Sequence, residues 1–141
     1  MYVGYQLTDR SVAKLMEIFP PSYSRVFGHH ITTKFGTTNK EDIPPYTEDV
    51  QVVGYADSGD GIEALVVSIN DDTTKEDGNL FHITWSLDPE KYKPVDSNAL
   101  VKNYKKIDPI SISVTPRMFT GKTPYKDVQV KETFIDYLKS L

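Results

Sequence analysis

The chain has 141 residues, of which 38% are hydrophobic and 26% charged, a composition typical of one globular domain. No segment approaches the roughly 18 consecutive apolar residues of a membrane-spanning helix, and the first ten residues lack the basic and then apolar order of a signal peptide. The chain has no cysteine, which excludes disulfides and thiolate metal sites. We therefore expect one cytoplasmic domain, residues 1–141, with no membrane contact and no evident obligate protein partner.

The net charge of −4 is unevenly distributed along the chain. Residues 36–79 contain eleven acids and two lysines, whereas residues 91–126 contain eight basic residues and two acids. The overall charge argues against extended, non-specific binding to nucleic acid, which needs many phosphate contacts. The basic segment is either a local site for a phosphorylated ligand or a solvated lysine-rich surface.

The first quarter of the chain predicts a strand followed by a helix. Residues 2–7 form a β-prone run. The helix is indicated by apolar residues at the spacing i, i+3, i+4 and i+7, which are Val12, Leu15, Met16 and Phe19. Thr8 or Asp9 can cap its start, and Pro20 with Pro21 ends it.

The middle of the chain contains the clearest hairpin. Residues 49–57 and 62–69 are β-prone and flank a Ser-Gly-Asp-Gly turn, whose glycines allow a tight reversal. The second run is apolar at nearly every position, which is typical of a central strand buried on both faces. A polar, acidic loop is expected over residues 70–79.

The last third predicts shorter elements. We expect a short helix beginning at Asp96 or Ser97, a strand over 110–114, and a loop that includes Pro116 and Arg117. A strand over 126–130 and a terminal helix over 132–141 would follow. No linker divides the chain, so the pattern indicates one α+β domain built from two pseudo-equivalent halves.

Two of the three histidines occur in the same tripeptide, His30-Ile31-Thr32 and His82-Ile83-Thr84, each within a β-prone run. Because side chains alternate along a strand, each histidine should share one face with its threonine, about 7 Å apart. The opposite faces, with Phe35 on the first strand and Trp85 on the second, should join the core. By the same rule Lys34 should lie beside His30, and His29 should point away, outside the site.

These four residues are suited to acid–base chemistry at phosphorus without a metal. One imidazole takes a proton from the attacking oxygen while the other gives a proton to the departing oxygen, and an ordinary pKa near 6.5 makes both forms accessible. The threonine hydroxyls would hold the phosphate oxygens. We name His30 and His82 as the acid–base pair, with Thr32 and Thr84 as phosphate ligands.

The paired tripeptides resemble the signature of the 2H phosphoesterase superfamily. The segment GHHITTKFG is similar to the first motif of its compact members associated with RNA repair. The resemblance implies a bilobal α+β fold with two antiparallel sheets facing across a central cleft, flanking helices and no cofactor or metal. It also implies substrates such as 2′,3′-cyclic phosphates at RNA ends, 2′-5′ linkages or cyclic oligonucleotides, and some phage members of the superfamily cleave cyclic-nucleotide immune signals.

Four further residues are candidates for binding the substrate. Lys34, Arg117 and Lys122 are possible phosphate contacts, and Tyr5 is one of several tyrosines able to stack on a nucleobase. Three rival interpretations stay open: a module that binds a nucleotide without cleaving it, a domain with no small ligand, and a zinc site built from His30, His82 and an acid.

Overall fold

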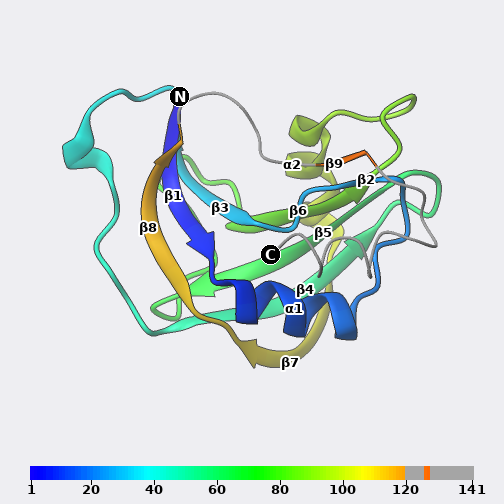
Figure 1. Cartoon of the computed structure of the whole chain (residues 1–141), viewed down its shortest axis with the longest axis horizontal. Coiled ribbons are helices and arrows are strands. Elements are labelled where there is room, and N and C mark those ends of the chain that lie inside the picture. Colours follow the sequence, from blue (N-terminus) through cyan, green and yellow to red (C-terminus); the bar gives the residue numbers. More distant parts are fainter. Residues whose placement is uncertain (120–125, 128–141) are drawn as a thin grey trace.

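Two antiparallel sheets and a few short helices make up the α+β fold (Figure 1). The computed structural model describes residues 1–119 and 126–127. The smaller sheet has the strand order β3-β1-β8, formed by His30–Phe35, Tyr2–Leu7 and Val114–Phe119. The larger sheet has the order β7-β4-β5-β6-β2-β9, formed by Lys105–Ser111, Val50–Asp57, Ile62–Ile69, His82–Leu87, Arg25–Val26 and Lys126–Asp127.

The helices lie at the ends and faces of these sheets. Helix α1 (Asp9–Ile18) follows β1, and α2 (Ser97–Leu100) is flanked by the 3-10 turns Pro94–Asp96 and Val101–Asn103. A further 3-10 turn spans Lys40–Asp42. None of the described helices is both long and apolar enough to cross a membrane.

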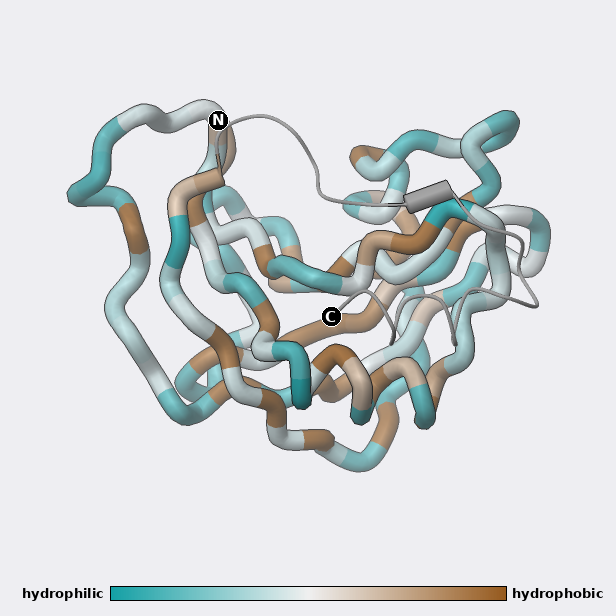
Figure 2. Tube along the Cα trace, in the orientation of Figure 1, coloured by the Kyte–Doolittle hydropathy of each residue, from teal (hydrophilic) through white to brown (hydrophobic). Residues whose placement is uncertain are grey.

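The main core is shared by both sheets and α1. Ile31 from β3, Leu15 from α1, and Leu65, Ile83 and Trp85 from the larger sheet belong to one buried cluster. Burying such side chains contributes roughly 1.5–3 kcal/mol each. The hydropathy colouring in Figure 2 follows this arrangement, with hydrophobic stretches along α1 and the central strands.

Strand β5 is buried at all eight positions because both of its faces are covered. Leu65 and Val67 face the shared core, whereas Ala64 and Val66 pack against Val101 beyond α2. This confirms the expectation of a central strand. The structure likewise confirms the strand over residues 2–7, the helix capped by the Thr8 side chain, the hairpin and both His-Ile-Thr strands.

The expectations for residues 110–117 were wrong. The predicted strand 110–114 is divided between the end of β7 and the start of β8, and Pro116 and Arg117, expected in a loop, lie within β8. Proline lacks a backbone N–H. It is tolerated in β8 because β8 is an edge strand, and one of its two sides has no neighbouring strand to pair with among the described residues. Of the strand predicted over 126–130, Lys126–Asp127 pairs with β2, and the predicted terminal helix lies outside the described residues.

Each His-Ile-Thr strand contains one extra residue immediately after its threonine. Gly4 and Val3 of β1 pair with Thr32 and Lys34, which leaves Thr33 as the extra residue of a bulge. In β6 the partners of Ala64 and Glu63 are Thr84 and Ser86, so Trp85 is the extra residue. The duplication therefore extends from the tripeptide to the backbone irregularity that follows it.

The bulge in β3 reverses the expected faces of the two residues that follow it, because an extra residue shifts the alternation by one. Phe35, expected in the core, is 80% exposed and lines the same pocket as His30. Lys34, expected beside His30, points elsewhere and forms an ion pair with Asp42 at 3.4 Å.

Candidate functional site

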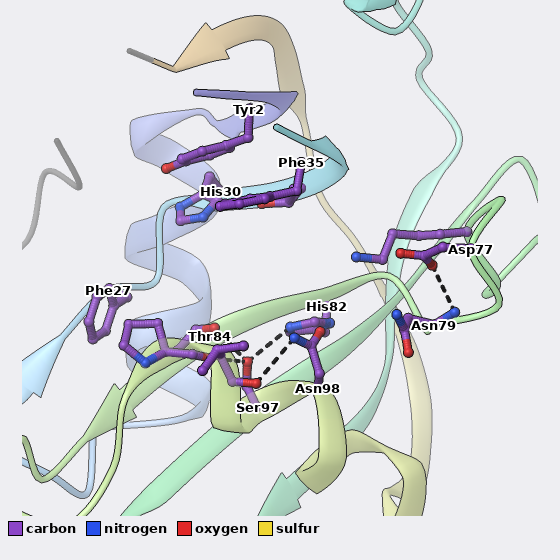
Figure 3. A pocket seen from close by; sticks show the side chains of 14 residues that line it. Tyr2, Phe27, His30, Phe35, Asp77, Asn79, His82, Thr84, Ser97 and Asn98 are labelled. Atoms are coloured by element: carbon purple, nitrogen blue, oxygen red, sulfur yellow. Dashed lines mark hydrogen bonds between the residues drawn. The ribbon is translucent and has the colours of Figure 1, made fainter. Parts of the chain in front are cut away.

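A pocket of about 470 Å³ brings the two tripeptides together (Figure 3). His30 and Thr32 line it from the smaller sheet, and His82 and Thr84 line it from the larger one. The remaining walls come from β1, the residue after β2, β3, the segment before β6, and α2 with the turn before it; they are Tyr2, Phe27, Phe35, Lys75, Asp77, Asn79, Pro94, Val95, Ser97 and Asn98. The volume is in the range of pockets that hold small ligands.

His82 is held by hydrogen bonds at both ring nitrogens. Its Nδ1 lies 2.9 Å from the carbonyl oxygen of Leu80, and because a carbonyl only accepts, Nδ1 carries the proton. In the neutral ring the lone pair is therefore on Nε2, which lies 3.0 Å from Ser97 Oγ. This is the tautomer that a general base on the pocket side requires.

The Ser97 hydroxyl suits both protonation states of His82. Its oxygen lies 2.9 Å from Thr84 Oγ1 and 2.6 Å from the carbonyl oxygen of Pro94, in addition to His82 Nε2. When His82 is neutral, Ser97 donates its one proton to Nε2. When His82 is protonated, Ser97 donates to Pro94 and accepts from Nε2. The hydroxyl therefore stabilises a ring that gains and loses a proton.

His30 sits on the opposite side of the pocket in a more apolar setting. Its ring centroid lies 5.2 Å from that of Tyr2 and 5.3 Å from that of Phe119. Its Nδ1 lies 2.7 Å from Nδ1 of His29. His29 was expected to point away; the expectation was wrong because the strand, and with it the alternation of faces, begins only at His30.

Burial lowers the pKa of both pocket histidines. For His30 the pKa falls to about 3, mainly through desolvation and further through the neighbouring His29 and His82. The pKa of His82 is lowered by burial and by Lys75, against the opposing effect of the Leu80 carbonyl. These shifts favour the neutral form of both rings at neutral pH, and a bound anion would raise both pKa values.

Three polar residues of the predicted acidic loop reach the pocket. Lys75, Asp77 and Asn79 precede β6 and line the pocket, and Figure 3 shows Asp77 and Asn79 on the same side as His82. Burial lowers the pKa of Lys75, and Asp77 opposes that shift. Among the described residues, Lys75 is the basic side chain that lines the pocket, and it lies in the most acidic part of the chain. No sequence pattern distinguishes Lys75 from other loop lysines.

The four secondary candidates are not gathered in the pocket. Tyr5 is 2% exposed and donates its hydroxyl to the Pro45 carbonyl, so it is a core residue. Arg117 donates to Gln6 Oε1 on the smaller sheet, Lys34 pairs with Asp42, and neither lines the pocket. Lys122 lies outside the described residues. Sequence reasoning did not select Ser97, Lys75 or Phe35 as pocket residues: it expected Ser97 at the start of a short helix and Phe35 in the core.

Within residues 1–119, no group of three or more histidine and carboxylate side chains is arranged to hold a metal ion. A scan against protein-family models and searches of curated proteins and of solved structures find no match to this chain. The function is therefore argued from the geometry of the pocket.

Proposed function

We propose that this chain is a metal-independent phosphoesterase of the 2H type, which hydrolyses a cyclic phosphate or a nucleotide phosphodiester. The observation that supports the proposal is that both copies of the tripeptide contribute a histidine and a threonine to one pocket from two different sheets. Histidines with purely structural roles would not need a repeated hydroxyl neighbour, a matching bulge and a shared opening.

In this mechanism His82 is the base and His30 is the acid. Nε2 of His82 takes a proton from a water while the Ser97 hydroxyl turns to Pro94, and the water oxygen forms a bond to phosphorus. The bond from phosphorus to the departing oxygen breaks, and that oxygen receives the proton on Nε2 of His30. His30 enters this step as imidazolium, a form that the phosphate anion favours by charge attraction. Solvent then resets both rings.

The other pocket side chains suit a nucleotide. Thr32, Thr84 and Lys75 line the pocket, and in this proposal they contact the phosphate oxygens. The exposed ring of Phe35 offers a flat surface for stacking a base. Asp77 and Asn79 supply acceptors and donors for a base edge. We propose as substrates 2′,3′-cyclic phosphates at RNA ends, 2′-5′ linkages or cyclic oligonucleotides.

The test is turnover in the presence of EDTA against a panel of nucleotides, with products resolved by chromatography. The panel contains 2′,3′- and 3′,5′-cyclic nucleotides, 2′-5′ and 3′-5′ dinucleotides, and cyclic oligonucleotides. Wild type is compared with the double variant His30→Ala/His82→Ala. Lys34→Ala is the matched control because Lys34 belongs to the same strand as His30 but does not line the pocket.

We expect wild type and Lys34→Ala to turn over one substrate class and the double variant to be inactive. Nucleotide that stabilises the protein against heat and is recovered unchanged would replace the proposal with a binding module. Activity that EDTA abolishes and zinc restores would replace it with a metal enzyme. No turnover and no shift in Tm with any member of the panel would indicate a domain without a small ligand.

A further inference from the structure

The His29 ring lies directly against the His30 ring. The ring centroids are 4.5 Å apart with an interplanar angle of 29°, and the two Nδ1 atoms are 2.7 Å apart. The preceding Gly28 has φ +63°, and a Cβ there would lie 2.9 Å from Met16 Cε and 3.0 Å from the Trp85 ring. A side chain at this position would be strained, so glycine suits the turn that leads to His29.

A contact of 2.7 Å between two imidazole nitrogens needs one proton between them. If both rings are neutral, either one can be the donor. If the pair gains a second proton and it resides on His30, both nitrogens of His30 carry hydrogen, and His29 Nδ1 must accept. As the general acid, His30 must be protonated at both nitrogens. In that state the hydrogen bond can run only from His30 Nδ1–H to His29 Nδ1.

The surroundings favour His30 over His29 as the place for that proton. His29 is 6% exposed, and within the described part of the chain its Nε2 has no hydrogen-bond partner. A charge on His29 would therefore be buried and poorly compensated. His30 instead borders the pocket, where a phosphate would lie. Burial lowers the pKa of His29 to about 4, which agrees with a neutral acceptor.

We propose that His29 is a positioning residue whose Nδ1 accepts the Nδ1–H of His30, so that His30 directs Nε2 to the pocket and carries the proton given to the departing oxygen. This inference rests on the proposed phosphoesterase function. His29 corresponds in role to the Leu80 carbonyl, which accepts from Nδ1 of His82. The difference is that a carbonyl is a permanent acceptor, whereas His29 is itself titratable.

The variants His29→Asn and His29→Gln form a matched pair for the test. Both are neutral amides, but asparagine places its oxygen near the position of the imidazole Nδ1, and glutamine places it near Nε2. We expect His29→Asn to retain kcat within about threefold and His29→Gln to lose about tenfold or more, with KM changed less than about threefold in both. Equal kcat in the two variants would overturn the proposal.

A second measurement needs no turnover. Long-range ¹H–¹⁵N spectra of the histidine rings would report a scalar coupling between the two Nδ1 atoms and the protonation of His30, with and without inorganic phosphate. Among the described residues, the titratable groups that line the pocket with His30 are Tyr2, Lys75, Asp77 and His82, and His29 contacts His30 from beside the pocket.

On phosphate addition at pH 5–6 we expect both His30 nitrogens to be protonated in wild type and in His29→Asn, but not in His29→Gln. Absence of the coupling in wild type from pH 5 to pH 8 would contradict the proposal. If the coupling is present but the protein turns over no substrate, the phosphoesterase function is refuted and the His29–His30 hydrogen bond stands. If the protein turns over substrate but kcat does not depend on residue 29, only the proposed role of His29 is refuted.

Discussion

Strand β3 is at the edge of a three-stranded sheet, whereas β6 lies inside the six-stranded sheet between β5 and β2. Both carry the same tripeptide and the same bulge, yet their histidines have different partners. His82 is held by a carbonyl and a serine hydroxyl, and His30 by a second histidine among aromatic rings. The repeated sequence therefore supplies two imidazoles, and their differing neighbours are the basis on which the proposed mechanism gives them different roles.

The largest expected effect concerns the departing oxygen. We expect His30→Ala and His82→Ala each to lower kcat about 10²–10⁴-fold on a nucleotide substrate. On an activated phosphodiester with a p-nitrophenolate leaving group, which departs without protonation, His30→Ala should recover most of the loss and His82→Ala should not. Steady-state kinetics of both variants on both esters measure this. If each variant loses the same factor in kcat on both esters, the assignment of His30 as the acid and His82 as the base is wrong.

The two bulges differ in the residue that pairs just beyond them, and opposite β6 that residue is Glu63, which makes stability depend on pH. It lies opposite Ser86, just after the bulge in β6, whereas the matching position opposite Lys34 is the apolar Val3. Glu63 is fully buried, and desolvation raises its pKa from 4.5 to about 7. Below pH 4.5 the carboxyl group is neutral in both folded and unfolded chains. Between pH 4.5 and 7 only the unfolded chain ionises, so stability falls as pH rises.

The variant Glu63→Gln does not titrate and should escape this loss. We expect its free energy of unfolding, relative to wild type, to increase by about 3 kcal/mol between pH 4 and pH 8. Urea denaturation at both pH values measures the difference. A difference that stays constant across this range would show that Glu63 has an ordinary pKa in the fold.

Removing the Ser97 hydroxyl should affect the His82 side of the pocket alone. We expect Ser97→Ala to lower kcat/KM about tenfold, because His82 loses the group that stabilises both of its protonation states. Asn98→Ala is the control, since Asn98 also lines the pocket but donates to the Val95 carbonyl rather than to a histidine. An equal loss in the two variants would mean that the turn, and not the hydroxyl, matters.

The smallest expected effect is at Phe35, whose place in the pocket depends on the bulge in β3. We expect Phe35→Ala to raise KM for a nucleotide about fivefold, because stacking on one base contributes roughly 1 kcal/mol. Unfolding should be almost unchanged, since the ring is 80% exposed. Phe35→Trp should restore KM. If neither substitution changes KM, the nucleobase does not stack on Phe35.

Strong periodicity and turn chemistry predicted most of the elements. Residues 2–7, the helix after Thr8, the 49–69 hairpin and both tripeptide strands were found from local patterns, because their burial follows the spacing of their apolar residues. The division of residues 105–119 into β7 and β8 was missed, because the prolines within them suggested loops and their edge positions are a property of the tertiary fold.

The limits of sequence reasoning at the site have two physical origins. Alternation predicted that each histidine shares a face with its threonine, and all four residues line one pocket, but alternation holds only where strand pairing is regular. It failed for Phe35 and Lys34 beyond the bulge, and for His29 before the strand begins. Ser97 and Lys75 reach the pocket through tertiary packing, for which neighbouring residues in sequence carry no signal.

The shared core has a mechanical consequence for the site. Ile31 and Ile83, the middle residues of the two tripeptides, lie in one buried cluster together with Trp85, on the side of the strands opposite the pocket. Packing in that cluster links the two strands that carry the imidazoles. A displacement of about 1 Å between reacting groups can cost roughly 100-fold in rate. In the proposed enzyme, a change in the volume of these apolar side chains would therefore change the spacing of the imidazoles, and with it the size of substrate that the site accepts.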